Sequence, residues 1–136
     1  MHGFRFTHDI RVRWVEVDAQ KIVFNAHYLT YVDIAFAEYL RRGLGVSEGQ
    51  MLHTVIAKTT LTFRQPAHYD ELLTVFVRTA HLGNTSMKVE FVISRVDDVL
   101  AEIETVYVYV DEAGRPTALP DTWKSAIYAY EPARNL

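Results

Sequence analysis

Hydrophobic residues change their spacing near the start of the chain. Up to residue 14 the main hydrophobic residues occupy even-numbered positions and the arginines odd-numbered positions. This alternation predicts a half-buried β-strand. The apolar members of this pattern are Phe4, Phe6, Ile10, Val12 and Trp14. From Leu29 to Leu40 apolar residues recur at steps of three and four, which predicts an amphipathic helix that ends at Gly43. The segment between the two patterns is therefore expected to be a loop that leads into a helix.

Four further segments rich in β-branched residues follow the predicted helix. They span residues 54–64, 72–80, 86–96 and 100–110. Turn-forming residues separate these segments at Pro66, at Gly83-Asn84, at Asp97-Asp98 and at residues 111–114. A short helix is predicted from Asp121 to Pro132. This order predicts an α+β fold, in which one curled antiparallel β-sheet wraps around a long central α-helix.

Length and composition agree with a single domain over residues 1–136. Of the 136 residues, 49% are hydrophobic and 23% are charged, which is ordinary for a globular protein. A net charge of −3 does not indicate nucleic-acid binding, which needs an excess of positive charge. The absence of Cys excludes disulfides and a Cys nucleophile. The sequence has no signal-like start and no apolar stretch of membrane-spanning length. We therefore expect a cytoplasmic protein without membrane insertion.

The loop before the predicted helix holds the candidate chemistry. Asp18 lies in this loop, and Asn25 is expected to be the N-cap of the helix. The free backbone amides of the first helical turn would point into the same loop, where they could polarise a carbonyl while Asp18 attacks it or activates a water. Taken alone, an Asp in such a loop is more commonly a turn former or a solvated surface acid.

The surrounding residues make the loop more specific. The set is Asp18, Ile22, Val23, Phe24, Asn25 and Tyr28. It resembles the signature of hotdog-fold acyl-CoA thioesterases of the 4-hydroxybenzoyl-CoA thioesterase type, including the Tol-Pal-associated branch. The resemblance continues through residues 63–72, 82–86 and 115–120, so it covers nearly the whole chain. It implies a hotdog thioesterase domain that hydrolyses an acyl-CoA. It implies no metal and no other cofactor; coenzyme A is part of the substrate.

The resemblance also implies roles and an assembly. Asp18 takes the place of the catalytic carboxylate, and the backbone amide of Asn25 polarises the thioester carbonyl. Relatives often carry His or Tyr at the second position, but a backbone donor is indifferent to the side chain. In this family two subunits join their sheets edge to edge, and an acyl pocket forms between them. We therefore expect a homodimer, which could pair again into a homotetramer, and we expect the long strands 86–96 and 100–110 to need such pairing.

Candidate substrate contacts follow from the same loop and from one hairpin. Val23, Tyr28 and Tyr31 are expected to border the acyl pocket. The turn 83–86 offers backbone amides and small hydroxyls that suit a phosphate or pantetheine group; its residues are Gly83, Asn84, Thr85 and Ser86. Arg64 and Lys88 could supply positive charge. Simpler interpretations exist: the tyrosines could be helix core, residues 83–86 could be only a hairpin turn, and Arg64 and Lys88 could lie on a solvated strand face.

Other functions are weighed against this one. A dehydratase on the same fold would need a catalytic His in the loop where Asn25 stands. Glu16 and Asp18 could suggest a glycosidase pair, but no sugar-stacking groove is implied around them. The six His residues have no metal-binding spacing, and nucleotide-binding and serine-hydrolase motifs are absent. From another class, the chain could be a noncatalytic acyl-CoA or acyl-carrier binding module, which an activity screen would distinguish.

Overall fold

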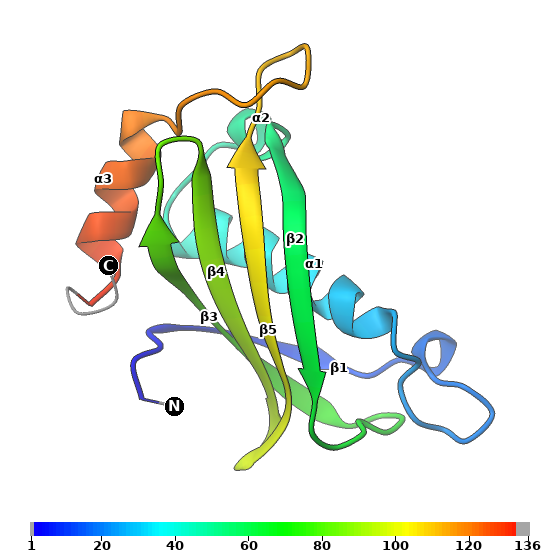
Figure 1. Ribbon diagram of the computed structural model, residues 1–136. Helices are drawn as coiled ribbons and strands as arrows, with labels where there is room; N and C mark the ends of the chain where they lie inside the picture. Colours follow the sequence, from blue (N-terminus) through cyan, green and yellow to red (C-terminus); the bar gives the residue numbers. More distant parts are fainter. Residues whose placement is uncertain (1, 133–136) are drawn as a thin grey trace.

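The computed structural model describes residues 2–132, and its main feature is one antiparallel sheet of five strands (Figure 1). The strands are β1 (Phe6–Arg11), β2 (Thr54–Phe63), β3 (Leu72–Leu82), β4 (Ser86–Arg95) and β5 (Asp98–Tyr109). Their spatial order is β1-β3-β4-β5-β2. The tight turns predicted at residues 83–84 and 97–98 are confirmed, since β3 pairs with β4 and β4 with β5.

This strand order places the open edges elsewhere than the sequence suggested. β4 and β5 are inner strands with a neighbour on both sides, so the expectation that they need a partner is wrong. The edges are β1 and β2, because β1 pairs only with β3 and β2 only with β5. Most residues of β2 are exposed. The edge that needs protection is therefore β2.

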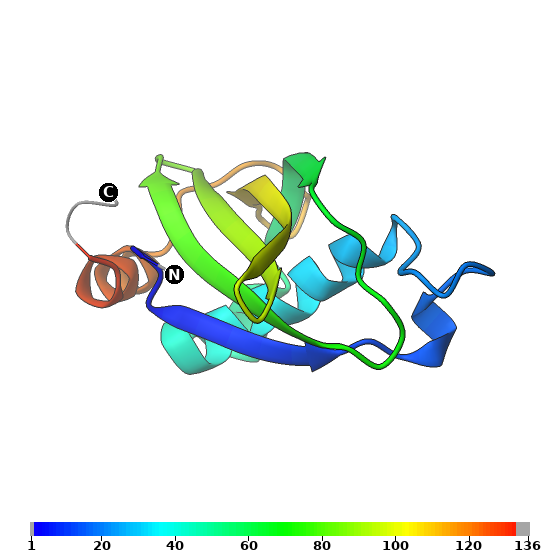
Figure 2. The same cartoon turned by 90° about the horizontal axis from the view of Figure 1, so that it is seen from below.

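One helix covers one face of the sheet (Figure 2). Helix α1 (His27–Glu38) continues directly into a π-helix, η2 (Tyr39–Gly43). The buried residues are Tyr28, Tyr31, Val32, Ala35, Phe36, Tyr39 and Leu40. They include the predicted apolar stripe except Leu29, which is 40% exposed. The helix ends at Gly43, where an added Cβ would lie 3.3 Å from Phe6. The long α-helix is thus confirmed only in part, since its last turn is π-helical.

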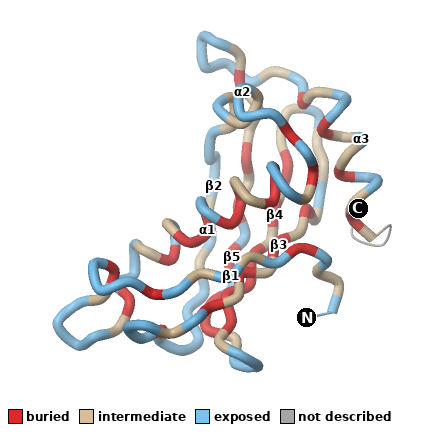
Figure 3. The backbone as a smooth tube through the Cα atoms, turned by 180° about the vertical axis from the view of Figure 1, so that it is seen from behind, coloured by how far each residue is buried: buried red, intermediate tan, exposed pale blue. Residues whose placement is uncertain are grey.

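The remaining helices are short. They are the 3-10 helix η1 (Trp14–Glu16), α2 (Glu48–Met51) and α3 (Asp121–Tyr130). The final helix is confirmed, and its Trp123 and Ile127 are fully buried. Buried residues gather on α1 and on the strands β3, β4 and β5 (Figure 3). No helix among residues 2–132 has the length and hydropathy that a membrane span requires.

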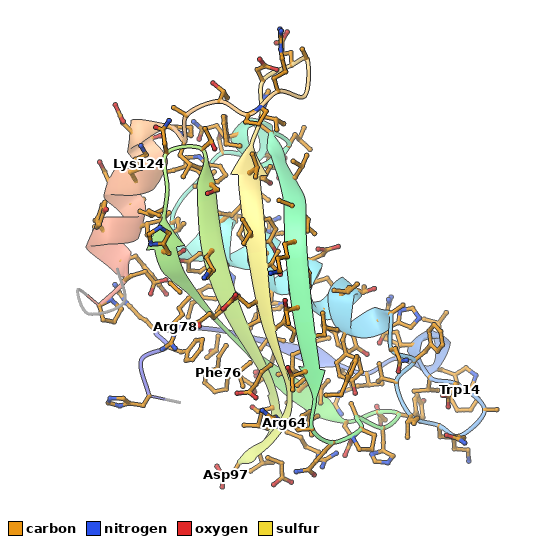
Figure 4. The ribbon with its side chains drawn as sticks, viewed as in Figure 1. Trp14, Arg64, Phe76, Arg78, Asp97 and Lys124 are labelled. Carbon is orange, nitrogen blue, oxygen red and sulfur yellow. The ribbon has the colours of Figure 1, made fainter. Side chains whose placement is uncertain are left out.

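The first strand is shorter than its alternation predicted. β1 ends at Arg11, and the chain turns into η1, so Trp14 lies outside the sheet, is 62% exposed and packs edge-to-face on Tyr69 (Figure 4). At the other end Phe4 leaves the core side and packs edge-to-face on Phe76, with the Arg78 guanidinium 4.1 Å from the centre of the Phe4 ring. The alternation therefore describes the core only between Phe6 and Val12.

Candidate active site

The loop that carries Asp18 folds back on itself between η1 and α1. The Asp18 amide donates to the Ile22 carbonyl (2.9 Å), and Val17 forms a bridge with Val23. Lys21 takes a positive φ of 63°, which closes the turn. The loop is therefore a small hairpin with defined hydrogen bonds.

Asp18 is exposed on this hairpin. Its Oδ1 accepts a hydrogen bond from the Gln20 amide at 2.8 Å, which is a turn-forming contact. Its Oδ2 has no hydrogen-bond partner among residues 2–132. One oxygen thus stabilises the loop, and the other is left for a water or a substrate.

The helix start differs from the prediction in one respect. Asn25 is not the N-cap, because Ala26 occupies that position and no side chain caps the helix. The chain turns before the helix proper, since the His27 amide already donates to the Phe24 carbonyl (2.9 Å) and the Tyr28 amide to the Asn25 carbonyl (3.3 Å). The amides of Asn25 and Ala26 have no acceptor within the part of the chain that the structure describes. Two adjacent backbone donors are consequently available at the helix start.

A hollow of about 230 Å³ lies at Asn25, the first of these two residues. It is lined by Ile22, Val23, Asn25, Tyr28, Phe63, Arg64, Gln65 and Pro66. Four predicted site residues therefore come together here: Val23, Asn25, Tyr28 and Arg64. Asp18 lies in the same hairpin but does not line the hollow of the single chain.

Tyr28 forms the back of this hollow. Its side chain is buried, its ring packs edge-to-face on Phe63 at 5.2 Å between centroids, and its hydroxyl accepts from the Ala67 amide at 3.1 Å. Burial raises the pKa of the Tyr28 hydroxyl, so this group stays protonated at neutral pH. Tyr28 thus supplies an apolar wall and joins the helix start to the loop after β2.

Tyr31 is placed differently from Tyr28. Its side chain is fully buried, and its hydroxyl donates to Glu16 Oε1 at 2.9 Å. Glu16 is only 1% exposed and also receives hydrogen bonds from the backbone and guanidinium of Arg13. Burial alone raises the pKa of Glu16, but the hydrogen bonds from Arg13 and Tyr31 outweigh it and hold this pKa below its usual value.

Glu16 is the residue that sequence reasoning missed. A Glu in a loop resembles a solvated acid, and its partner Tyr31 is a full helical turn inside α1. The only sequence signal is the spacing of three between Arg13 and Glu16. Because Glu16 is buried and ion-paired while Asp18 is exposed, the two carboxylates do not face a common groove.

The other predicted contacts lie apart from the loop. The turn 83–86 joins β3 to β4 at the opposite end of the sheet from α1's first turn (Figure 1). Lys88 pairs with Glu104 at 3.8 Å, and Arg64, at the end of β2, pairs with Glu102 at 2.8 Å (Figure 4). A single chain therefore does not bring residues 83–86 and Lys88 to Asp18, and their role stays a prediction.

A second hollow, of about 210 Å³, lies between α1 and the start of β2. It is lined by Asp33, Phe36, Ala37, Leu40, Met51, Thr54, Ile56 and Tyr107. Burial raises the pKa of Asp33. The two hollows thus lie at the two ends of the exposed edge strand β2. Among residues 2–132, no three His, Asp or Glu side chains converge on a possible metal position.

Comparison with known proteins places this geometry in a family. The model of the thioesterase superfamily matches residues 20–102. An acyl-CoA thioester hydrolase, YbgC, of Escherichia coli O6:H1 is 27% identical over 125 residues, which are 88% of this chain and 93% of that protein.

Solved structures agree with the family match. A thioesterase of Thermus thermophilus, complexed with coenzyme A and Zn, is 28% identical to this chain. The two structures align with a TM-score of 0.86, over 96% of this chain and 97% of the Thermus thermophilus chain. A 1,4-dihydroxy-2-naphthoyl-CoA thioesterase of Synechocystis is 20% identical with a TM-score of 0.81, over 90% of this chain and 94% of its own, and shares the fold. Since the family match spans more than half of the chain, the protein belongs to the thioesterase superfamily and is a thioester hydrolase.

Proposed function

We propose that the protein hydrolyses acyl-CoA thioesters at the loop that carries Asp18. The observation that carries this proposal is the pair of unpartnered amides at Asn25 and Ala26, at the edge of a hollow, in the same loop as Asp18, whose Oδ2 has no partner among residues 2–132. The 28% identical Thermus thermophilus thioesterase, which was solved with coenzyme A, supports this class of substrate.

The proposed chemistry uses groups of the chain and water. The thioester oxygen accepts hydrogen bonds from the Asn25 and Ala26 amides, which stabilise the negative charge that develops on it. Asp18 Oδ2 either adds to the carbonyl carbon or removes a proton from a water that adds there. The carbon–sulfur bond then breaks, and the coenzyme A thiolate leaves without needing much protonation. In the nucleophilic variant a water finally hydrolyses the acyl anhydride on Asp18.

We propose that the active unit is a homodimer formed through β2. An exposed edge strand with free amides and carbonyls favours pairing with another strand. In β2 the apolar side chains Val55, Ile56 and Phe63 are about half exposed, which suits a covered strand. Antiparallel pairing of two copies would bring the Thr54 end of one subunit to the Phe63 end of the other. The hollow at Asp33 and Tyr107 would then adjoin the partner's hollow, and an acyl pocket would form between them.

A charge in β2 should separate the two subunits. Val55→Lys places an ammonium on the edge where the partner strand would lie, so we expect light scattering to shift from a dimer toward the 15.7 kDa monomer, with loss of turnover. Val96→Lys is the matched control, because Val96 is 86% exposed in the turn between β4 and β5. A wild-type protein that is fully active as a monomer would contradict the dimer proposal.

A panel of acyl-CoA substrates tests the proposed function itself. Short, long, branched and aromatic acyl-CoAs are mixed with the protein, and the released coenzyme A thiol is measured. We expect turnover of at least one class. Saturable binding of acyl-CoA without thiol release across the whole panel would contradict hydrolysis and support a noncatalytic binding module.

A further inference from the structure

We propose that Glu16 is a positioning residue, which fixes the Asp18 hairpin against the start of α1 through Arg13 and Tyr31. This proposal rests on the proposed role of Asp18. The buried carboxylate is completely used by its neighbours: Oε1 accepts from the Arg13 amide (2.8 Å) and the Tyr31 hydroxyl (2.9 Å), and Oε2 from the Arg13 guanidinium (2.8 and 2.9 Å). It therefore joins the segment after β1 to the middle of the helix.

The backbone of the same residue joins the two sides of the loop. The Glu16 carbonyl accepts from the Phe24 amide at 3.0 Å, and the next two rungs are the Val17–Val23 bridge and the bond from the Asp18 amide to the Ile22 carbonyl. Asp18 thus belongs to the rung at the turn end of this ladder, and Asn25 directly follows Phe24 of the rung at the opposite end. The ladder therefore sets the position of Asp18 relative to the free amides at the helix start.

Glu16 holds this ladder to α1 itself. Arg13 reaches the carboxylate from the segment after β1, and Tyr31 reaches it from the helix, about one turn beyond the free amides. Loss of either donor would let the hairpin shift relative to the helix start. Small displacements of reacting groups reduce rates far more than they reduce binding. The expected effect therefore falls on kcat rather than on KM.

Truncating Glu16 itself is a poor test, because it would leave the buried Tyr31 hydroxyl without its partner. Tyr31→Phe removes one hydrogen bond and keeps the ring. The same helical segment offers a matched control in Tyr39, whose hydroxyl bonds to Thr79 Oγ1 at 2.8 Å and donates to Glu131. Tyr39 is eight residues from Tyr31, about 12 Å along the helix, so Tyr39→Phe deletes an equivalent buried hydroxyl away from the loop.

The experiment measures kcat, KM and urea unfolding for both variants. We expect Tyr31→Phe to lower kcat about tenfold with KM within about twofold, as a small displacement of a reacting group should. Tyr39→Phe should be destabilised to a similar extent but retain the wild-type kcat. A wild-type kcat in Tyr31→Phe, or an equal loss of kcat in the two variants, would overturn the positioning role.

A double-mutant cycle with Asp18→Asn separates this proposal from the proposed function. If Glu16 acts through Asp18, Tyr31→Phe should change the residual turnover of Asp18→Asn by less than about twofold, because residues that act together are not additive. A full tenfold loss in that background would overturn the positioning role alone. Wild-type activity of Asp18→Asn would instead overturn the proposed function, and this proposal with it.

Discussion

Asp18→Asn is expected to lower turnover at least ~10²-fold, the order that is typical of losing a catalytic acid or base. The fold should be unchanged, because the Oδ1 atom of an Asn can still accept the hydrogen bond from the Gln20 amide that closes the turn. What is lost is Oδ2, which the change replaces with an amide nitrogen. That nitrogen neither attacks a carbonyl nor takes a proton from water at neutral pH.

This result is checked by thiol release with the best substrate of the acyl-CoA panel. Circular dichroism and the unfolding midpoint should match those of the wild-type protein. Asp97→Asn is the matched control, since Asp97 is an exposed Asp in the turn between β4 and β5 and should keep its activity (Figure 4). If Asp18→Asn retained more than half of the wild-type activity, the proposed site would be wrong.

Asn25→Pro is expected to abolish measurable turnover at a temperature where the protein is folded. Proline has no backbone N–H, so the change removes one of the two unpartnered amides at the helix start. Asn25→Ala keeps this amide. It should also keep the stability of the protein, because the Asn25 side chain does not cap the helix.

Both variants are compared by kcat and by thermal unfolding. Ala26→Pro is the companion variant, because the φ of Ala26 is −64° and already suits proline. It removes the second free amide, and we expect a loss of turnover here as well. Equal activity of Asn25→Ala, Asn25→Pro and Ala26→Pro would exclude the polarising role of these amides.

The site loop could be predicted because it lies between two strong local patterns. The alternation from Phe6 to Val12 and the apolar stripe from Val32 to Leu40 are both present in the structure, so Asp18 lies in a loop that precedes a helix. The N-cap lies one residue later than the sequence predicts. The Phe24 and Asn25 carbonyls accept hydrogen bonds from the amides three residues later, so the chain already turns before the helix begins. The residue types at these positions do not predict this turn.

Other features depend on contacts between distant segments. The edges of the sheet follow from the pairing of β1 with β3 and of β2 with β5, which skip the neighbours in sequence. The buried state of Glu16 depends on Tyr31 in another element. Local periodicity contains neither kind of information. The exposure of Trp14 has the same origin, since the strand pattern does not reveal where β1 stops.

The carbonyl stretch of a bound thioester reports directly whether the helix start polarises this carbonyl. A ¹³C-labelled acyl-CoA is bound to Asp18→Asn, which should turn it over slowly enough for infrared difference spectra. We expect the carbonyl band to move to lower frequency on binding, and the shift to become smaller when Asn25→Pro removes one of the two amides. A carbonyl band at its solution frequency in the Asp18→Asn complex, or a shift of unchanged size in the double variant, would contradict polarisation of the carbonyl by these amides.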